Sequence, residues 1–431
     1  MNFVFVSLQR INTDRDSTST SLAKELAKSH RVLYVNSPIA RGTAVKASGA
    51  DKYTKAHISA IKSKKDPLSQ LSENLWVLNP PSIIESLNWI PFTGIFSLAN
   101  RLNNKRLADD IRSALERLGI TQFILINDKD IFRSFYLKEL LKPEKYIYLD
   151  RDYTIGVDYW KKHGTKLEPE LMRKSDAVVC NSYDFVTRAK LYNPNSFYIG
   201  NGFNVEQYSS ATERVEPEDL KAIPGPRIGY VGALLSIRLD IALMVEMAKA
   251  RPAWSFVLIG PEDQDFKDSE LHVLPNVYFL GKKHTSEVPA YTAHFHVCVN
   301  PQILNDITKG NFPLKVVEYL AMGRPVVATE TNTMNEVFSS YAYLADSPTS
   351  FIAQIEKALL QDNGQVQQER KRFAQNFSWQ KVAELLLASI AGNHTREKEA
   401  VLKKLEGPVE AYLPALSLGF SGEARKSMGL K

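Results

Sequence analysis

The sequence predicts an α/β protein of two Rossmann-like domains, each with a parallel sheet, and the two sheets facing each other across a cleft. Three observations lead to this prediction. The chain has 431 residues, more than the roughly 250–300 at which a single hydrophobic core stops growing. Short apolar runs alternate with amphipathic segments almost throughout, which is the pattern of parallel strands covered by helices. The alternation also occurs in two series, each of about 200 residues.

Composition and termini narrow the class. An apolar share of 44 % with 24 % charged residues can fill a core in both domains. No apolar run approaches the roughly 18 residues of a membrane-spanning helix. The first residues, MNFVFVSL, lack the pattern of a secretory signal and predict a first strand. Cys180 and Cys298 each lie in an apolar run, which predicts buried, reduced thiols and a cytoplasmic location.

The first domain is expected to span residues 1–205. Its helices should include Leu22–Ser29, which follows a polar loop. Its predicted strands are Phe3–Ser7, Val32–Asn36, Leu75–Leu78, Phe123–Asn127, Tyr146–Asp150, Ala177–Cys180 and Phe197–Ile199.

The second domain is expected to span residues 206–376. A turn signal at Asn201–Asn204 and a polar segment ending in Pro224-Gly225-Pro226 mark the boundary. Helical periodicity at Ile241, Met244, Val245 and Ala248 exemplifies its helices. Its predicted strands are Ile228–Val231, Ser255–Ile259, Val277–Leu280, Val297–Asn300 and Val326–Ala328.

The most informative segment runs from Asn305 to Thr329. Pro313 is suited to the first turn of a helix, where its missing N–H is no loss, and Gly323 is suited to ending that helix. The free N–H groups of the first turn favour an anionic ligand. Glu318 lies one turn further along an otherwise apolar helix, and a carboxylate there can accept two hydrogen bonds from a vicinal diol such as a ribose.

This segment resembles the donor-site signature of GT-B retaining glycosyltransferases of family 4, also called glycosyl transferases group 1. The matching residues are Phe312, Pro313, Glu318, Ala321, Gly323, Pro325, Val326 and Val327. The resemblance implies a GT-B fold, in which Glu318 binds the nucleotide ribose and the backbone of Phe312, Pro313 and Leu314 approaches the donor sugar. The signature departs from the family at Gly310, where a glutamate is usual, and Lys315 could recruit a phosphate.

Three strand-to-helix turns of the second domain extend the resemblance. Gly232 permits a sharp turn, and Arg238 before the next helix could clamp a diphosphate. Family members usually carry an arginine where this chain has Ala233, and a lysine where it has Arg238. Gly260 and Gly281 meet the need for close backbone approach to the nucleotide, although plain tight turns explain them as well.

Acceptor contacts are expected in the first domain. Asp128 and Asp152 fall where predicted strands end, at the sheet edge that should face the cleft. Capping of the following helices is the competing interpretation. The hydroxyls and Arg15 of the loop Ser7–Ser21 could replace the backbone contacts of a glycine pair that the family usually has there, although a solvated loop explains them equally well.

Two neighbouring segments suggest contact with an anionic membrane. Residues 41–65 are basic, and residues 87–96 are apolar but too short to span. A solvated charged face is the alternative. Nucleic acid is excluded as a partner, because no binding motif accompanies the net charge of +6.

The predicted function is therefore transfer of a sugar from a nucleotide-sugar donor to a glycan or lipid-linked acceptor, with retention, in the synthesis of cell-surface polysaccharides or glycoconjugates. Arg238 and Lys315 would stabilise the departing diphosphate. The nucleotide-sugar is a substrate, and neither a cofactor nor a metal is expected, since the eight histidines show no ligand spacing.

Two alternatives stay open: another GT-B enzyme such as a sugar-nucleotide epimerase, and a non-catalytic GT-B scaffold, which Gly310 favours. A dehydrogenase is disfavoured because no G-x-G-x-x-G turn follows a strand. The resemblance further implies that residues 377–392 form a crossover helix returning to the first domain, capped by Ser378. Residues 393–431 are expected to be a charged extension. The expected location is the cytoplasm. If residues 41–65 and 87–96 do contact an anionic membrane, the protein would attach peripherally at the inner face of the cell membrane.

Overall fold

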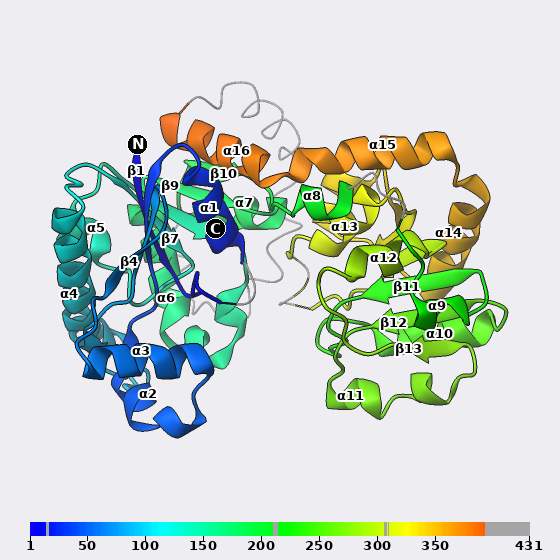
Figure 1. Ribbon diagram of the computed structural model, residues 1–431, viewed down its shortest axis with the longest axis horizontal. Helices are drawn as coiled ribbons and strands as arrows, with labels where there is room; N and C mark the ends of the chain where they lie inside the picture. The colour runs from blue at the N-terminus through cyan, green and yellow to red at the C-terminus, as the bar shows by residue number, and fades with distance from the viewer. Residues whose placement is uncertain (14–16, 210–213, 306–307, 309, 393–431) are drawn as a thin grey trace, which may run out of the picture. The chain divides into compact units, whose positions relative to one another are not determined.

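The computed structural model describes residues 1–13, 17–209, 214–305, 308 and 310–392 (Figure 1). Residues 1–387 form one compact unit. Arg15 and the predicted extension 393–431 lie outside the described residues. Among the helices that are described, none is both long enough and apolar enough to cross a membrane.

The first sheet has eight strands in the order β10-β9-β8-β7-β1-β2-β5-β4. Neighbours pair in parallel except β4 and β5. All seven predicted strands are present. The edge strand β4 was not predicted, because four of its five residues are exposed and leave no apolar signal. The strands are β1 (Asn2–Ser7), β2 (Arg31–Val35), β4 (Leu68–Ser72), β5 (Leu75–Leu78), β7 (Ile124–Asp128), β8 (Lys145–Asp150), β9 (Ala177–Cys180) and β10 (Ser196–Tyr198).

Helices cover both faces of this sheet. Apolar side chains of α4 (Thr93–Arg117), α6 (Asp158–Lys174) and α7 (Tyr183–Lys190) form one core cluster with one face of the strands. Helix α1 (Thr18–Leu26) packs on β1 and β2. Shorter elements of this half are β3 (Ile39–Ala40), β6 (Ile83–Ile84), α2 (Arg41–Val45), α3 (Lys52–Lys62) and α5 (Leu137–Leu141).

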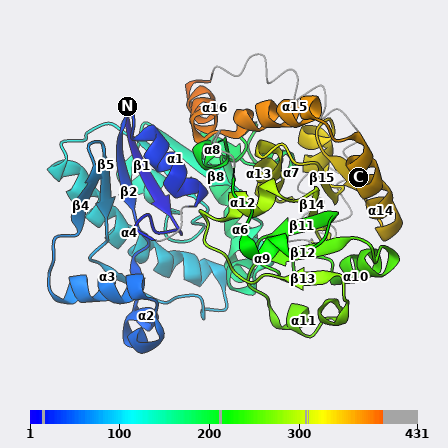
Figure 2. The same ribbon diagram turned by 45° about the vertical axis from the view of Figure 1, so that its right-hand side comes forward.

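The second sheet has six parallel strands in the order β13-β12-β11-β14-β15-β16. The five predicted strands are present, and the short β16 is additional. One core cluster joins the sheet to α10 and α14, and another joins it to α12 and α13 (Figure 2). The strands are β11 (Arg227–Val231), β12 (Ser255–Ile259), β13 (Val277–Phe279), β14 (Val297–Asn300), β15 (Val326–Thr329) and β16 (Tyr343–Ala345); the helices are α10 (Ile241–Ala250), α12 (Val288–Ala293), α13 (Leu314–Ala321) and α14 (Pro348–Gln361).

Two segments lie side by side near the predicted domain boundaries. The Phe203 N–H donates to the Phe377 carbonyl at 3.0 Å, and Phe203 pairs with Ser378 as an isolated bridge. The Ser378 Oγ accepts from the Lys381 N–H at 3.3 Å, as expected for the cap of α16 (Trp379–Ala391). The boundaries themselves stay predictions. The other elements here are α8 (Val205–Ser209), α9 (Glu218–Lys221), α11 (Gln264–Lys267) and α15 (Gly364–Ala374).

Both cysteines are buried and free, as predicted. Burial raises the pKa of each thiol above its ordinary value, so both stay protonated near neutral pH.

Candidate active site

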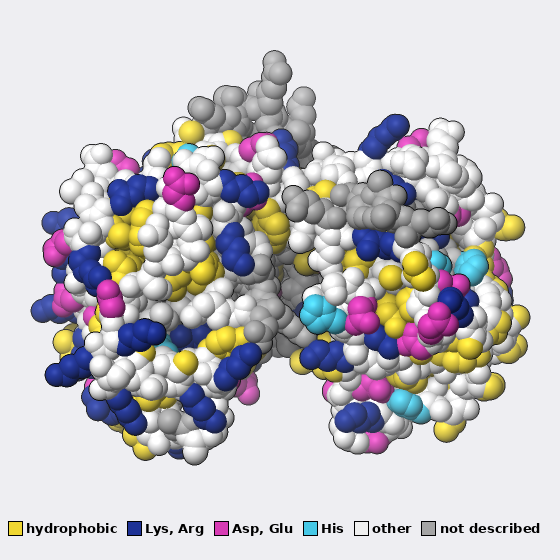
Figure 3. All heavy atoms as spheres, viewed as in Figure 1, with side chains coloured by type: hydrophobic (Ala, Val, Ile, Leu, Met, Phe, Trp, Pro, Cys, Tyr) yellow, Lys and Arg dark blue, Asp and Glu magenta, His cyan; other side chains and the backbone are white. Residues whose placement is uncertain are grey.

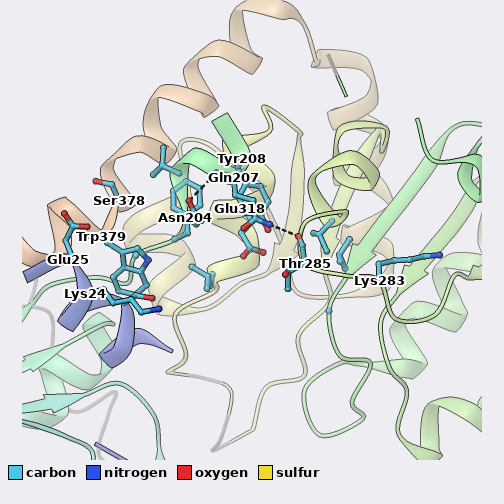
Figure 4. A pocket seen from close by; sticks show the side chains of 18 of the residues that line it. Lys24, Glu25, Asn204, Gln207, Tyr208, Lys283, Thr285, Glu318, Ser378 and Trp379 are labelled. Carbon is cyan, nitrogen blue, oxygen red and sulfur yellow. Dashed lines mark hydrogen bonds between the residues drawn. The ribbon is translucent and has the colours of Figure 1, made fainter. Parts of the chain in front are cut away.

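A cavity of about 940 Å³ lies at the carboxyl ends of β11 and β12 (Figure 4). Four of the predicted site residues line it: Gly232, Gly260, Leu314 and Glu318. Ligands of open parallel sheets bind at this end of the strands. The wall also includes α1, the segment after β10 and the start of α16, through Ser21, Lys24, Glu25, Lys28, Gly202, Phe203, Asn204, Val205, Gln207, Tyr208, Ser378, Trp379 and Gln380.

Two glycine turns bring the backbone close to itself on one wall. Gly232 has φ +152° and Gly260 has φ +154°, a region that residues with a side chain rarely adopt. A Cβ at residue 260 would lie 1.8 Å from the Gly232 carbonyl oxygen. The Gly232 N–H donates to the Ile259 carbonyl at 2.8 Å. Both positions therefore require glycine, and the turns leave peptide groups at the cavity wall.

Lys315, on the first turn of α13, lies against the Gly232 turn. A Cβ at residue 232 would come within 2.1 Å of Lys315 Cε and 2.6 Å of Nζ. The ammonium is 5.5 Å from the centroid of the Tyr230 ring. The structure therefore brings two predicted residues together, a glycine turn and a cation, in an arrangement suited to a diphosphate.

Glu318 is half-buried on the cavity wall, and its carboxylate accepts a hydrogen bond from the Tyr208 hydroxyl. Burial raises the pKa of Glu318 above 4.5, and the Lys315 charge and the Tyr208 hydrogen bond act in the opposite direction. The side chains of Tyr208, Gln207 and Glu318 gather in one part of the cavity (Figure 4). A carboxylate with acceptor capacity left in such a pocket suits the hydroxyls of a ribose.

The residues directly before α13, which include the predicted contacts Phe312 and Pro313, do not line the cavity. Phe312 is buried, with its ring 5.8 Å from that of Phe338 and 5.7 Å from that of Phe377. Pro313 is the N-cap of α13, one residue earlier than predicted. A Cβ at Gly310 would lie 3.3 Å from Phe185 Cε1, so this position faces the start of α7.

Asp184, beside Gly310, connects the two halves of the compact unit. Its carboxylate accepts from Asn332 Nδ2 at 2.8 Å and from Thr333 Oγ1 at 3.2 Å. A Cβ at Gly310 would lie 3.5 Å from Asp184 Cβ. A carboxylate therefore stands next to the place where the family signature has its first glutamate.

Arg238 and Asp152 lie outside the lining of the cavity but interact with each other electrostatically. Arg238 is exposed on the loop between β11 and α10. The pKa of Asp152 is raised mainly because surrounding protein desolvates it, although the side chain is 52 % exposed, and the charges of Arg151, Lys129 and Arg238 oppose the rise. The two predicted residues are therefore in the same region without a direct hydrogen bond recorded between them.

Asp128 does not fit its predicted role as an acceptor contact, because its side chain is fully buried. It accepts from Ser7 Oγ at 2.6 Å and from Arg151 Nε at 2.6 Å. Burial alone would raise the pKa of Asp128, but the Arg151 charge and these hydrogen bonds hold it below its ordinary value. A strand-end position indicated the right edge of the sheet but not the depth of the side chain. Asp128 holds Arg151 in place.

A buried quartet of charges supports the same sheet edge: Lys129, Asp150, Glu168 and Arg188. The Lys129 ammonium pairs with both carboxylates, and Arg188 Nη2 donates to Asp150 Oδ2 at 2.6 Å. Burial would raise the pKa of Glu168, but Arg188 and Lys129 lower it to about 2. The quartet is neutral as a set, which makes the burial of four charges tolerable.

Sequence reasoning missed several cavity residues after β10 and at α16. Tyr208 reaches Glu318, Gln207 Nε2 donates to the Thr285 carbonyl at 2.6 Å, and Trp379 lies against Gly202. The first two fall within the predicted domain boundary, residues 201–226, to which no site residue was assigned. An aromatic residue soon after the Asn201–Asn204 turn was the signal available.

Gly281 is a left-handed turn residue with φ +65° and open space where a Cβ would stand. It does not line the cavity, but Lys282 and Lys283 after it do. Within the described residues no cluster of three or more His, Cys, Asp or Glu side chains could hold a metal ion; the metal-free reaction stays a prediction.

Comparison with known proteins agrees with this geometry. Residues 225–362 match the family model described as glycosyl transferases group 1. A protein named as a candidate teichuronic acid biosynthesis glycosyltransferase, TuaH of Bacillus subtilis (strain 168), is 28 % identical over 228 residues. That match covers 49 % of this chain and 56 % of TuaH, so the chain spans little more than half of that relative's length.

Solved structures resemble nearly the whole chain. HepE of Anabaena in complex with UDP is 14 % identical, covers 91 % of this chain and all of its own, and has a TM-score of 0.62. Sucrose-phosphate synthase of Thermosynechococcus elongatus is 14 % identical, covers 93 % of this chain and 99 % of its own, and has a TM-score of 0.58. At such identity the likeness concerns the fold. The chain therefore has the GT-B fold, and its residues 225–362 are similar to the glycosyl transferases group 1.

Proposed function

We propose that this protein transfers a sugar from a nucleotide-sugar donor to a glycan or lipid-linked acceptor in polysaccharide or glycoconjugate synthesis. The observation that carries the proposal is the joint lining of one cavity by the Gly232 turn, the Gly260 turn and Glu318, with Lys315 against the first of these. Peptide groups and a cation can hold a diphosphate, and a carboxylate can hold a ribose. The family match over the same residues supports this assignment.

Negative charge builds on the leaving diphosphate as the sugar departs, and fixed positive groups can stabilise it. Lys315 and the N-terminus of α13 are candidates for this role, and the exposed Arg238, outside the cavity lining, is the third. Such preorganised charge stabilises the transition state more than the ground state. Retention of configuration is the outcome that the family resemblance implies. NMR of the product's anomeric proton would determine it.

The acceptor side favours an anionic group. Arg10 follows β1, and its guanidinium contacts His57 Nδ1 at 3.1 Å from both Nη1 and Nη2. Because His57 Nε2 donates to the Pro80 carbonyl, Nδ1 accepts from Arg10 and the ring is neutral. Burial and the Arg133 charge lower the pKa of Arg10, while Asp51 opposes them. Arg10 and Arg133 follow the neighbouring strands β1 and β7, and two arginines at this sheet edge suit the phosphate of a lipid-linked acceptor.

The first test is binding of nucleotides to the full chain. Thermal-shift titration with UDP, GDP and dTDP is expected to reveal one that stabilises, since saturation at a hundred times the dissociation constant contributes about 2.7 kcal/mol. UDP is the first probe because the HepE complexes contain it. No shift with any nucleotide or nucleotide-sugar would overturn the proposal.

The second test separates an enzyme from a binding scaffold. The nucleotide-sugar that binds is incubated with lipid-linked and glycan acceptors, and release of the nucleoside diphosphate is measured. Release that depends on an acceptor supports transfer. Conversion of the sugar without an acceptor would identify an epimerase, and tight binding without turnover would identify a non-catalytic scaffold.

A further inference from the structure

The first half of the chain exposes a row of large apolar side chains. Trp89 and Phe92 precede α4, and Ile95, Leu98 and Leu102 lie on it at helical spacing; they are 58–76 % exposed. The opposite face of α4 is packed in the core through Phe96, Leu107 and Ile111. Contiguous exposed apolar area on one helix face marks an interaction surface.

The start of α6 adjoins this row. Thr93 Oγ1 and His163 Nδ1 are 3.1 Å apart, and Asn88 Nδ2 donates to the Tyr159 carbonyl at 3.1 Å. Val157 and Tyr159, at the start of α6, are 52 % and 54 % exposed. We call the seven residues Trp89, Phe92, Ile95, Leu98, Leu102, Val157 and Tyr159 the α4 surface.

The charges around the α4 surface are nearly all positive. No acidic residue occurs from 86 to 108, whereas Arg101, Lys105 and Arg106 do; of these, Arg106 pairs with Glu85, just before this range. Lys161 and Lys166 are exposed on α6, and Asp158 is the one exposed acid next to them. The positive sign excludes a basic partner and complements an anionic one.

The basic run predicted from the sequence lies beside the same helix. Arg41, at the start of α2, and Arg106, on α4, both bind Glu85, at 2.7 Å and 3.0 Å. Lysine and arginine side chains gather over α2 and α3 on the face shown in Figure 3. Within residues 41–65 and 87–96, the apolar side chains of Ile58, Ile90 and Phe96 are buried and do not contribute to an exposed surface.

We propose that the α4 surface inserts into the interfacial layer of an anionic membrane, with the surrounding lysines and arginines on lipid headgroups. Tryptophan and tyrosine at the rim favour this layer, because their rings are apolar with one polar tip. The aliphatic row supplies apolar area, and each basic residue near an anionic surface adds attraction that fades with salt.

The place of the surface fits delivery of a lipid-linked acceptor. The Phe132 ring lies 4.8 Å from the Trp160 ring and 6.3 Å from the Tyr159 ring, and Arg133 follows directly. The α4 surface therefore adjoins Arg133, whose charge acts on Arg10. Membrane binding itself does not rest on the proposed transferase activity, and the experiment measures it separately.

The test is co-sedimentation of the full chain with phosphatidylcholine vesicles containing 0 or about 30 % phosphatidylglycerol. An apolar variant carries Leu98→Ser, Leu102→Ser and Trp89→Ser. A charge variant carries Arg101→Gln, Lys105→Gln and Lys161→Gln. The matched control carries Val273→Ser and Leu360→Ser, which are 76 % and 86 % exposed on the second half. Circular dichroism and thermal melts show that each variant is folded.

We expect the parent and control to pellet with anionic but not neutral vesicles. The apolar variant should bind at least fivefold more weakly at every salt concentration, and the charge variant should lose binding mainly at low salt. Equal pelleting of parent and apolar variant, or no pelleting by the parent, would overturn the proposal. So would a dimer of the parent in light scattering that the apolar variant abolishes, because a second copy would then be the occupant.

Discussion

The Lys315 side chain covers the Gly232 turn, so that a Cβ at residue 232 would come within 2.1 Å of Lys315 Cε. Lys315→Met removes the cation and keeps most of the apolar stem. We expect a loss on the order of a hundredfold in transfer rate, since the charge stabilises the departing diphosphate. Steady-state kinetics with the matched control Lys249→Met, on the exposed part of α10, provide the comparison. Equal loss in both variants would rule out a specific role.

Glu318→Gln should weaken donor binding by about 1.5–3 kcal/mol, because a charged acceptor of ribose hydrogen bonds is replaced by a neutral one. The raised pKa of Glu318 also predicts the direction in which donor affinity changes with pH. Burial raises the pKa of Glu318 above 4.5, so the ionised form, and with it donor affinity, declines as pH falls through that raised pKa. Calorimetry at several pH values should show this decline of donor affinity in the parent and no such decline in the variant. Unchanged nucleotide affinity would remove Glu318 from the site.

Arg238→Ala should lower turnover more than it weakens nucleoside binding. The guanidinium is exposed near Asp152, and its proposed role is to stabilise charge that builds on the diphosphate, which a nucleoside lacks. A rate loss on the order of a hundredfold is expected. Inhibition constants for the nucleoside monophosphate and diphosphate decide the matter: if the variant and the parent give the same pair of values, Arg238 is only a surface residue.

His57 should make stability depend on pH. Burial and the Arg10 charge lower the pKa of His57 from 6.5 to about 4. As pH falls, the unfolded chain therefore binds a proton at His57 before the folded chain does. The contribution of neutral His57 to the free energy of unfolding is fully present above pH 6.5 and is lost as pH falls to about 4. The gap corresponds to about 3 kcal/mol at most. Urea unfolding at pH 7 and pH 4.5 should show a smaller difference for His57→Gln than for the parent, and parallel losses would contradict the assignment.

The fold could be predicted because its signal is local. Each buried parallel strand is a short apolar run, and all twelve predicted strands are present. Four strands of the described residues were not predicted: β4 because most of its residues are exposed, and β3, β6 and β16 because each has only two or three residues. The joint lining of one cavity by Gly232, Gly260 and Glu318 was predictable for a similar reason, since turns and a helix close to them in sequence fix their positions; their contacts with a donor stay predictions.

The rest of the site depends on contacts between residues far apart in the chain. Tyr208 reaches the cavity from the predicted domain boundary, and Trp379 reaches it from the start of α16, far away in the chain. Asp128 was placed at the correct edge, but its burial depends on Arg151 and Ser7, which no periodicity reveals. Sequence spacing gives the direction of a side chain and not its depth.

The quartet of Lys129, Asp150, Glu168 and Arg188 constrains how this half of the protein can change over time. Loss of any one member would leave one buried charge unpaired among the other three, at a cost of about 3–5 kcal/mol. A first substitution is therefore harmful unless a second follows in an oppositely charged member. Relatives of this chain should thus carry the four together or have replaced them in oppositely charged pairs, and single departures should be rare among them.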